Sequence, residues 1–398
     1  MLDLATAREL VLAECASLPP ERVGLADSAG RVLAEDASSL VDLPPFDRSA
    51  MDGYAVRAAD TGPGVRLALA GAVAAGDVPV TSLAPGEAVA VTTGAALPDG
   101  ADAVLQAELA DPDGDEVECA AAVAPARHVR FRGEDVRRGD VLAAAGQVVT
   151  IQRLSALASS GLGEVSVRRR ARVRVLATGS ELLALGAPPE PGRIHESNRL
   201  VVATMAAAAG ADVVSTGTVP DDADATRMAI AAALEDSDVL LITGGVSVGA
   251  HDHVKRALDD CGVSEIFWRV RMKPGKPLWF GRAASTLVFG LPGNPLSAIA
   301  GALCFVRPAL RRLHGDSGRD PTSVRVRLAE AAQADDGRTT LLAAALAPGA
   351  DGVLEATPLP DQGSHLTGGL ARADGFVVVE HDAGRLRAGT LVDALTLS

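Results

Sequence analysis

The sequence predicts a multidomain protein in which a central α/β domain with a parallel sheet is combined with β-rich regions. The chain has 398 residues, which is too long for one ordinary core. From residue 173 onward, short apolar runs alternate with helical patterns, as expected for a parallel sheet covered by helices. Before and after that stretch, apolar runs are separated by Gly and Pro turns, which is typical of β-rich modules.

The N-terminal half is expected to contain two helices and one β-rich module. Residues 4–16 place apolar side chains at helical spacing. Residues 65–120 hold short Val, Ala and Leu strands between turns that contain Gly or Pro. A second helix is expected from Thr150, as its N-cap, to about Ser160, with Gly161 ending it.

The central part repeats a strand–loop–helix unit, and the C-terminal part returns to alternating strands. The arginine run at 168–170 between these regions and the N-terminal half is expected to be a solvated linker. The expected central strands are 173–177, 213–219, 239–242 and 286–289, and the expected helices are 198–209, one ending near 234, 252–260 and one ending near 313. Strands at 324–328 and 375–380 predict a small C-terminal β-barrel or sandwich.

Composition and charge exclude several classes of function. The net charge of −14 and the pI of about 5.0 disfavour a nucleic-acid-binding protein, which needs a basic face. The longest apolar stretch is far shorter than a membrane span, and the N-terminus lacks the order of a signal peptide. The four cysteines form no C-x-x-C pair, which favours reduced thiols. We therefore expect a cytoplasmic protein that binds neither nucleic acid nor membrane.

Four polar loops each follow a strand of the expected parallel sheet. Ligands of such sheets bind outside the carboxyl ends of the strands. If the sheet is parallel, all four loops lie on one edge and form one site. The loops are Thr178-Gly-Ser-Glu181, Asp221-Asp222, Gly244-Gly-Val-Ser-Val-Gly249 and Pro292-Gly-Asn-Pro295.

The third loop has the composition of a phosphate-binding loop. Gly244, Gly245 and Gly249 let the backbone approach an anion closely and expose its N–H groups. Ser247 adds a hydroxyl donor. A Gly-Gly loop alone is weak support, because many such loops are only turns.

The loop at Pro292 to Pro295 and the lysines before it add positive potential. Asn294 is a good N-cap and Pro295 a good first helical residue, so a helix that starts there presents its positive end. Lys273 and Lys276 are compact charges suited to phosphate or another oxyanion. The alternatives are an ordinary turn and a solvated loop.

The carboxylates Glu181, Asp221 and Asp252 are oxygen ligands of the kind that Mg²⁺ prefers. Mg²⁺ bound by one or two of them would bridge them to a substrate phosphate. The alternative is equally simple, because Asp221, Asp222 and Asp252 could instead cap the helices that follow them. Their occurrence together with the glycine loop and the lysines favours a site for a phosphorylated, metal-assisted substrate.

These motifs and three in the N-terminal half occur in the order seen in the molybdopterin molybdenumtransferase (MoeA) family. The resemblance spans nearly the whole chain, and the family is similar to the E domain of gephyrin. On general grounds alone, the N-terminal motifs would be turns or strand ends. The motifs are SAMDGYAV at 49–56, TGA at 93–95, RGED at 132–135, GGVSVG at 244–249 with Asp252, KPGKP at 273–277 and LPGNP at 291–295.

The resemblance implies four domains and an elongated homodimer. Its site would form between the α/β domain of one subunit and the inserted domain of the other. The resemblance also implies that the protein contacts other molybdenum-cofactor biosynthesis proteins. The implied domains are a split helical connector (1–36 and 137–168), an inserted β-rich domain (37–136), an α/β domain resembling molybdopterin adenylyltransferase (169–318) and a C-terminal β-barrel-like domain (319–398).

The implied reaction inserts molybdate into adenylylated molybdopterin, with Mg²⁺ as cofactor and AMP as leaving group. By motif position, the resemblance implies that Asp52 and Asp135 are catalytic together with Glu181, Asp221 and Asp252. Thr93 and Pro292 fall in motifs that bind substrate. The side chains implied to hold molybdate are Lys273, Lys276, Ser297 and Ser364.

One position departs from the family pattern. The family has an arginine that reaches the oxyanion a few residues after a Gly-Arg pair. Alignment on Gly337-Arg338 places Ala343 at the position of that arginine. Either Arg338 takes over its role, or the alignment gap belongs at another position. The departure leaves tungstate open as the preferred oxyanion. Two other functions also stay open, a non-catalytic scaffold of the gephyrin E type and a molybdopterin adenylyltransferase.

Overall fold

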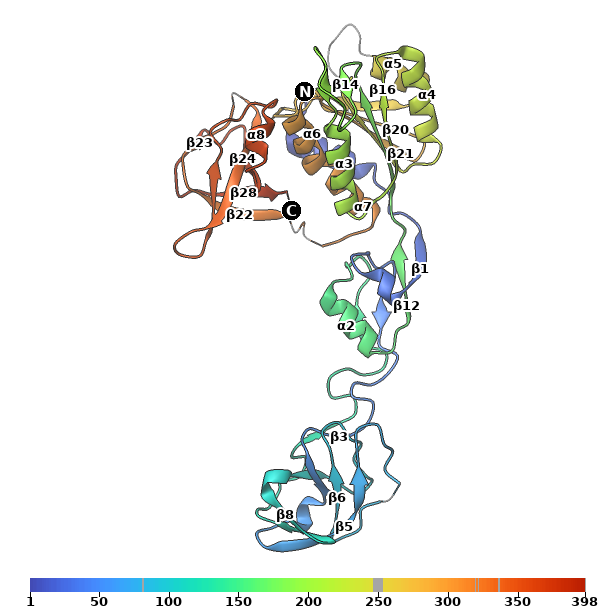
Figure 1. Ribbon diagram of the computed structural model, residues 1–398, viewed down its shortest axis with the longest axis vertical. Helices are drawn as coiled ribbons and strands as arrows, with labels where there is room; N and C mark the ends of the chain where they lie inside the picture. The colour runs from blue at the N-terminus through green and yellow to red at the C-terminus, as the bar shows by residue number, and fades with distance from the viewer. Residues whose placement is uncertain (81, 246–252, 319, 321, 336, 398) are drawn as a thin grey trace.

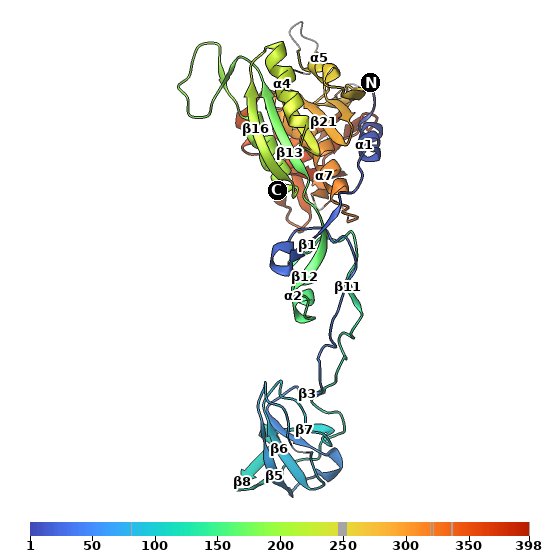
Figure 2. The same ribbon diagram turned by 90° about the vertical axis from the view of Figure 1, so that its right-hand side faces the viewer.

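The computed structural model shows an elongated molecule in three parts (Figures 1 and 2). A β-rich domain lies at one end and a slender connector in the middle. An α/β domain lies beside a β-barrel at the other end. The structure describes residues 1–80, 82–245, 253–318, 320, 322–335 and 337–397.

The β-rich domain is one mixed six-stranded sheet in the order β7-β4-β6-β5-β9-β8. Side chains from its strands build two cores on its two faces, because neighbouring residues such as Ala55 and Val56 point to opposite sides. This confirms the expected β-rich module. Its strands are β4 (Gly53–Val56), β5 (Val65–Val73), β6 (Glu87–Val91), β7 (Ala103–Gln106), β8 (Ala110–Asp113) and β9 (Glu116–Cys119).

The connector consists of two antiparallel strand pairs, one α-helix and one short 3-10 helix. Strand β1 (Pro20–Gly24) pairs with β12 (Glu164–Arg168), and β2 (Ala37–Ser38) pairs with β11 (Val141–Ala143). Helix α2 (Ile151–Ser159) begins after Thr150, whose side chain caps it as expected. A third pair, β3 (Arg48–Ser49) with β10 (Val129–Arg130), joins the connector to the β-rich domain. The short helices of these two parts are η1 (Leu25–Ser28), η2 (Ala58–Asp60) and η3 (Ala107–Leu109).

The first helix, α1 (Leu4–Ala13), packs on the α/β domain and not on the rest of the connector. Leu4, Ala7 and Val11 are buried in the main core of that domain. The Arg8 side chain also donates to the Cys304 carbonyl at 3.2 Å. The domain bounds given above stay a prediction, but this helix contributes its apolar face to the α/β core.

The α/β domain has a six-stranded sheet in the order β16-β13-β17-β21-β20-β18. The first four strands are parallel, as expected, and they are β13 (Arg172–Thr178), β16 (Asp212–Val219), β17 (Val239–Thr243) and β21 (Thr286–Leu291). Two antiparallel strands, β18 (Ser264–Trp268) and β20 (Trp279–Ala283), extend the sheet and were not predicted.

Helices cover both faces of this sheet. Along β17, Val239 and Leu241 face one core while Leu240 and Ile242 face the other, which follows from the two-residue period of a strand. The helices are α3 (Asn198–Ala208), α4 (Ala223–Leu234), α5 (His253–Asp260), α6 (Pro295–Gly301), the π-helical segment η4 (Ala302–Val306) and α7 (Arg307–Leu313). The small parallel pair β14 (Leu182–Leu183) and β15 (Ile194–His195) lies at the sheet edge.

The C-terminal domain is a closed barrel, because its first and last strands also pair with each other. Strand β19 (Met272–Lys273) of the α/β domain adds to β24, so it ties Lys273 to the barrel. The five barrel strands are β24 (Thr339–Pro348), β25 (Leu354–Pro358), β22 (Ser323–Leu328), β28 (Leu391–Thr396) and β26 (Gly375–Val379), and the short elements are β23 (Ala332–Gln333), β27 (Arg385–Leu386) and α8 (Thr367–Leu370).

The arginine run at 168–170 links the connector to the α/β domain, as expected, but it is only partly solvated, because two of its three side chains are half-buried. Arg169 donates two hydrogen bonds to the Asp238 carboxylate, at 2.7 and 2.9 Å. The adjacent Ala171 N–H donates to the buried His314 ring at 2.9 Å. The sequence hid these contacts because both partners lie more than 65 residues away along the chain. In the described part of the chain, no helix has the length and apolar character needed to cross a membrane.

Candidate functional site

The four polar loops meet at the carboxyl ends of the parallel strands, as predicted from topology. They line a cavity of about 350 Å³, which we call the rim cavity. Residues of β14, of β15 and of the start of α3 also line it. Its lining includes Thr178, Gly179, Glu181, Asp221, Gly244, Gly245, Gly293 and Pro295.

The two aspartates after β16 have different surroundings. Asp222 caps helix α4, since its carboxylate accepts the Ala225 N–H at 2.8 Å. Asp221 lines the rim cavity and exchanges two hydrogen bonds with Ser180. The Ser180 N–H donates to the Asp221 carboxylate at 3.0 Å, and the Asp221 N–H donates to the Ser180 hydroxyl at 2.9 Å. The capping alternative therefore holds for Asp222, while Asp221 faces the cavity beside Glu181.

The two glycines after β17 are required by close approach. Gly244 and Gly245 have φ angles of 86° and 64°, a region that side chains disfavour. A Cβ at Gly244 would lie 2.6 Å from the Thr178 carbonyl oxygen, and one at Gly245 would lie 2.8 Å from the Thr178 hydroxyl. The rest of that loop, with the predicted Ser247, Gly249 and Asp252, lies outside the described residues.

Two side chains of the rim cavity, Glu196 and Asn198, were not predicted as site residues, whereas Thr178 belongs to one of the four predicted loops. Thr178 is the last residue of β13, and its buried hydroxyl has no hydrogen-bond partner among the described residues. Glu196 is buried and pairs with Arg199 at 3.2 Å. Asn198 donates to the Gly293 carbonyl at 2.6 Å, so it fixes the neighbouring loop. The helix start at 198 was visible in the sequence, but its position beside the sheet edge was not.

A second cavity of about 550 Å³, the lysine cavity, lies between the α/β domain and the barrel. Lys273 and Lys276 line it, and both are exposed. Ser297 is buried in α6, and Ser364 enters from the barrel side. The structure thus brings together all four residues implied to hold molybdate.

One loop separates the two cavities. Pro292 and Asn294 line the lysine cavity, whereas Gly293 and Pro295 line the rim cavity. Asn294 stands at the N-cap position of α6, but its side chain makes no cap and donates to the Ser364 hydroxyl at 3.0 Å. The expected capping role of its side chain is therefore wrong, although the helix does start at Pro295.

The barrel supplies an arginine to the lysine cavity from a position other than 343. Arg338 lines the cavity and contacts the Asp335 carboxylate. Ala343 is buried in the barrel wall, where its backbone N–H and carbonyl bond the Gln362 side chain, each at 2.9 Å. Of the two alternatives, the geometry favours substitution by Arg338.

The predicted residues of the β-rich domain form a separate cluster. The Thr93 N–H and hydroxyl both donate to the Asp52 carboxylate, at 2.6 and 2.9 Å. These bonds, the backbone one first, lower the pKa of Asp52, which keeps it ionised. Asp135 lines an open cavity near the connector, with Arg48 and Arg130. Figure 1 shows the β-rich domain at the opposite end of the molecule from β14. A single chain therefore does not bring Asp52 and Thr93 to the rim cavity.

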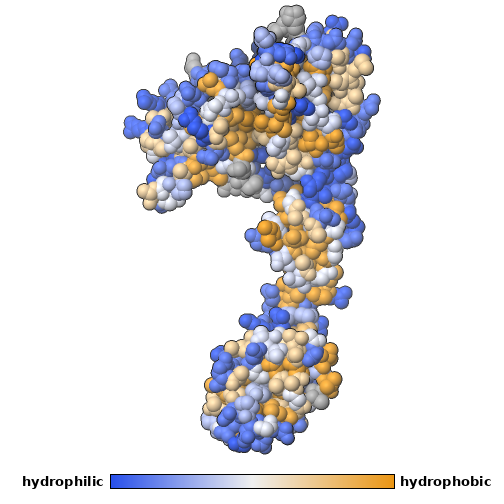
Figure 3. All heavy atoms as spheres, in the orientation of Figure 1, coloured by the Kyte–Doolittle hydropathy of each residue, from blue (hydrophilic) through white to orange (hydrophobic). Residues whose placement is uncertain are grey.

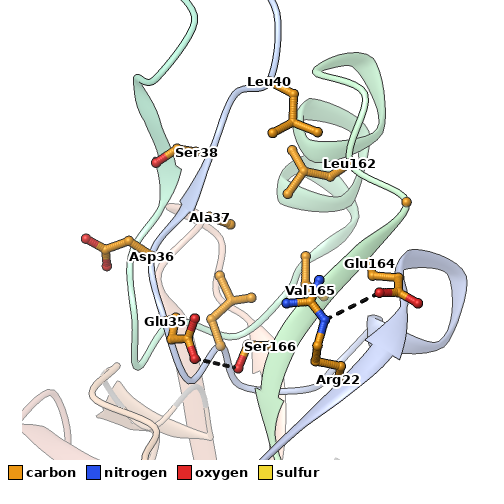
Figure 4. A pocket seen from close by; sticks show the side chains of 12 residues that line it. Arg22, Glu35, Asp36, Ala37, Ser38, Leu40, Leu162, Glu164, Val165 and Ser166 are labelled. Carbon is orange, nitrogen blue, oxygen red and sulfur yellow. Dashed lines mark hydrogen bonds and ion pairs between the residues drawn. The ribbon is translucent and has the colours of Figure 1, made fainter.

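A further cavity of about 390 Å³ lies in the connector (Figure 4) and holds none of the predicted site residues. Each of its charged groups has a partner, and that of Asp36 is the Ala145 N–H at 2.8 Å. Arg22 pairs with Glu164 at 3.4 Å, and the Ser166 hydroxyl donates to Glu35 at 3.2 Å. No three His, Cys, Asp or Glu side chains in the described ranges are grouped as a metal site.

Comparison with known families matches most of the chain in three segments. The model of the MoeA N-terminal region (domain I and II) matches residues 2–161. That of a probable molybdopterin binding domain matches residues 174–312. That of the MoeA C-terminal region (domain IV) matches residues 325–397. The order of the segments is the order of the folded parts described above.

Individual relatives match over nearly the full length. The chain is 34% identical to the molybdopterin molybdenumtransferase of Haemophilus influenzae, over 98% of each chain. It is 37% identical to molybdopterin molybdenumtransferase 2 of Mycobacterium tuberculosis, over 95% of each. The crystal structure of a molybdopterin biosynthesis MoeA protein from Pyrococcus horikoshii OT3 superposes with a TM-score of 0.84, at 28% identity and over 100% of both chains.

Proposed function

Because the chain belongs to the molybdopterin molybdenumtransferase (MoeA) family, which acts in molybdenum cofactor biosynthesis, we propose that it inserts molybdate into adenylylated molybdopterin and releases AMP. One observation carries this proposal. The loop from Pro292 to Pro295 forms a common wall between an acidic, glycine-lined cavity and a cationic one. Such a pair of adjacent cavities suits a substrate with a phosphate linkage beside a separate oxyanion.

In this proposal the phosphate linkage lies in the rim cavity. The loop that begins at Gly244 offers backbone N–H groups to phosphate oxygens. Glu181 and Asp221 would hold Mg²⁺, and Asp252 is the third candidate ligand. The donor set fits, because a Cβ at Gly179 would lie 2.8 Å from a Glu181 carboxylate oxygen, so this glycine leaves room for the carboxylate. Mg²⁺ is usually held by one or two carboxylates, substrate phosphate and water, and it polarises that phosphate.

Molybdate lies in the lysine cavity. Lys273, Lys276 and Arg338 supply positive charge, and Ser364 supplies a hydroxyl donor. When the linkage is cleaved and AMP leaves, negative charge develops next to the common wall. The lysines offset that charge, and the pairing of β19 with β24 already holds the Lys273 backbone in place.

The site is completed by a second copy of the chain. Asp52 and Thr93 form an ordered, ionised cluster, yet in one chain the cluster lies far from the rim cavity. Exposed hydrophobic side chains support a homodimer, and Figure 3 shows hydrophobic residues across one face of the connector. The exposed hydrophobic side chains of the connector and of its junction with the β-rich domain include Leu40, Phe46, Phe131, Val141 and Ile151. Cytoplasmic location and contacts with other molybdenum-cofactor biosynthesis proteins stay predictions.

The test is AMP release from adenylylated molybdopterin in the presence of molybdate and Mg²⁺. Asp52→Ala and Lys276→Ala are each expected to lower release at least about 100-fold, with circular dichroism unchanged. Glu190→Gln is the matched control, since Glu190 is an exposed residue that pairs with the neighbouring Arg193. If Asp52→Ala and Lys276→Ala both release AMP at the wild-type rate, the proposal is wrong. Adenylylation of molybdopterin by ATP, with release of pyrophosphate, would instead indicate an adenylyltransferase.

A further inference from the structure

Asp335 contacts two of the three cations of the lysine cavity, although it does not itself line that cavity. Its carboxylate lies 3.4 Å from the Lys273 ammonium and contacts the Arg338 guanidinium. Lys273 comes from the α/β domain and Arg338 from the barrel, so one carboxylate joins cations of two domains.

The backbone around Asp335 is held firmly. The Asp335 N–H donates to the Thr340 hydroxyl at 2.7 Å, and that hydroxyl donates to the Arg338 carbonyl at 3.1 Å. The Arg338 N–H donates to the Asp335 carbonyl at 2.9 Å. Thr340 is buried and pairs in register with Lys273. The carboxylate and the two cations are therefore attached to one hydrogen-bonded corner of the barrel.

The charges of this group suit a divalent anion. Lys273, Lys276 and Arg338 contribute three positive charges, and Asp335 contributes one negative charge, which leaves a net charge of +2. Without Asp335 the cavity would carry +3 and would attract any oxyanion more strongly. Arg338 would also lose the contact that fixes its guanidinium. An unrestrained guanidinium can move closer to the cavity centre and so form hydrogen bonds with a smaller anion.

From this geometry we infer that Asp335 is a positioning residue that sets the oxyanion selectivity of the lysine cavity. Its carboxylate pairs with both Arg338 and Lys273 and so fixes the positions of these two cations around a large tetrahedral dianion, and its negative charge weakens binding of oxyanions in general. The inference rests on the proposed function only in that molybdate occupies this cavity.

The experiment is calorimetric titration of the full chain with inorganic molybdate alone and with inorganic sulfate alone, at constant ionic strength. Asp335→Asn is expected to bind molybdate about tenfold more tightly, which is the effect of one unit charge roughly 6 Å from a dianion in a high dielectric. Sulfate affinity is expected to rise further, so the ratio of molybdate to sulfate affinity falls. Asp351→Asn, which breaks the Arg327 pair of the same barrel, is the control and leaves both affinities unchanged.

If folded Asp335→Asn binds molybdate as tightly as the wild type or more weakly, the inference is wrong. The contacts of Asp335 with Lys273 and Arg338 would then serve only to join the two domains. If that variant does not fold, Asp335→Glu decides. It keeps the charge but moves the carboxylate, so the affinity ratio must fall while molybdate affinity stays within about threefold. An unchanged ratio contradicts the inference. The proposed function fails in a different way. If the wild type and Lys276→Ala bind molybdate equally well, molybdate does not occupy the lysine cavity.

Discussion

The neighbouring carboxylates Asp221 and Asp222 allow catalysis and stability to be separated at adjacent positions. Asp221→Asn removes a charge from the rim cavity but keeps an oxygen that can accept the Ser180 N–H. We expect unfolding free energy to change by less than about 0.5 kcal/mol. We expect AMP release to fall about 100-fold or more, since loss of a metal-binding carboxylate removes about 3 kcal/mol of transition-state stabilisation.

Asp222→Ala is expected to show the opposite behaviour. The substitution removes the 2.8 Å bond to the Ala225 N–H at the start of α4, and loss of an N-cap costs about 1 kcal/mol. Turnover should stay within about twofold of the wild type, because this carboxylate points away from the cavity into the cap. The assays are urea unfolding followed by circular dichroism and AMP release at saturating molybdate. Normal turnover by Asp221→Asn, or equal loss in both variants, would refute the reasoning.

Three further predictions concern the two cavities and the linker. Lys276→Ala is expected to raise the KM for molybdate about tenfold or more, measured by AMP release, and an unchanged KM would place the oxyanion elsewhere. Thr178→Val is expected to stabilise the chain by about 1 kcal/mol in urea unfolding, because the buried hydroxyl it replaces has no partner among the described residues. A loss of stability would contradict this. Burial lowers the pKa of His314 from 6.5 to about 4, so the unfolded chain binds a proton that the folded chain rejects between these values. Stability should therefore fall by about 3 kcal/mol as the pH drops from 7 to 4. His314→Gln, which keeps an acceptor for the Ala171 N–H, should flatten that pH dependence in unfolding experiments, and an unchanged slope would argue against this role.

Much of the fold was predictable because its signals are local. Apolar runs that end in polar loops identify β13, β16, β17 and β21, and Thr150 marks the start of α2. Strands β18 and β20 were missed because the local sequence does not distinguish antiparallel strands added to the sheet from a loop between two parallel strands. The placement of α1 was missed because its partners, such as Phe305, are remote in sequence.

The site was predictable where topology alone decides the geometry. Loops after parallel strands must meet, so Glu181, Asp221 and Gly244 could be grouped without any contact information. The lysine cavity could not be derived in this way, because it needs the closed barrel and the β19–β24 pairing to bring Ser364 and Arg338 to Lys273. The role of Asp335 follows only from distances.

The central claim is that two copies of the chain share each site, and mixing two inactive variants tests it most directly. Asp52→Ala disables the β-rich domain's contribution, and Asp221→Asn disables the rim cavity of the α/β domain. After random pairing, half of the dimers are mixed, and each mixed dimer holds one intact site of two. The account predicts recovery of about a quarter of wild-type AMP release. No recovery, although mixed dimers are demonstrated by differential tags, would contradict it.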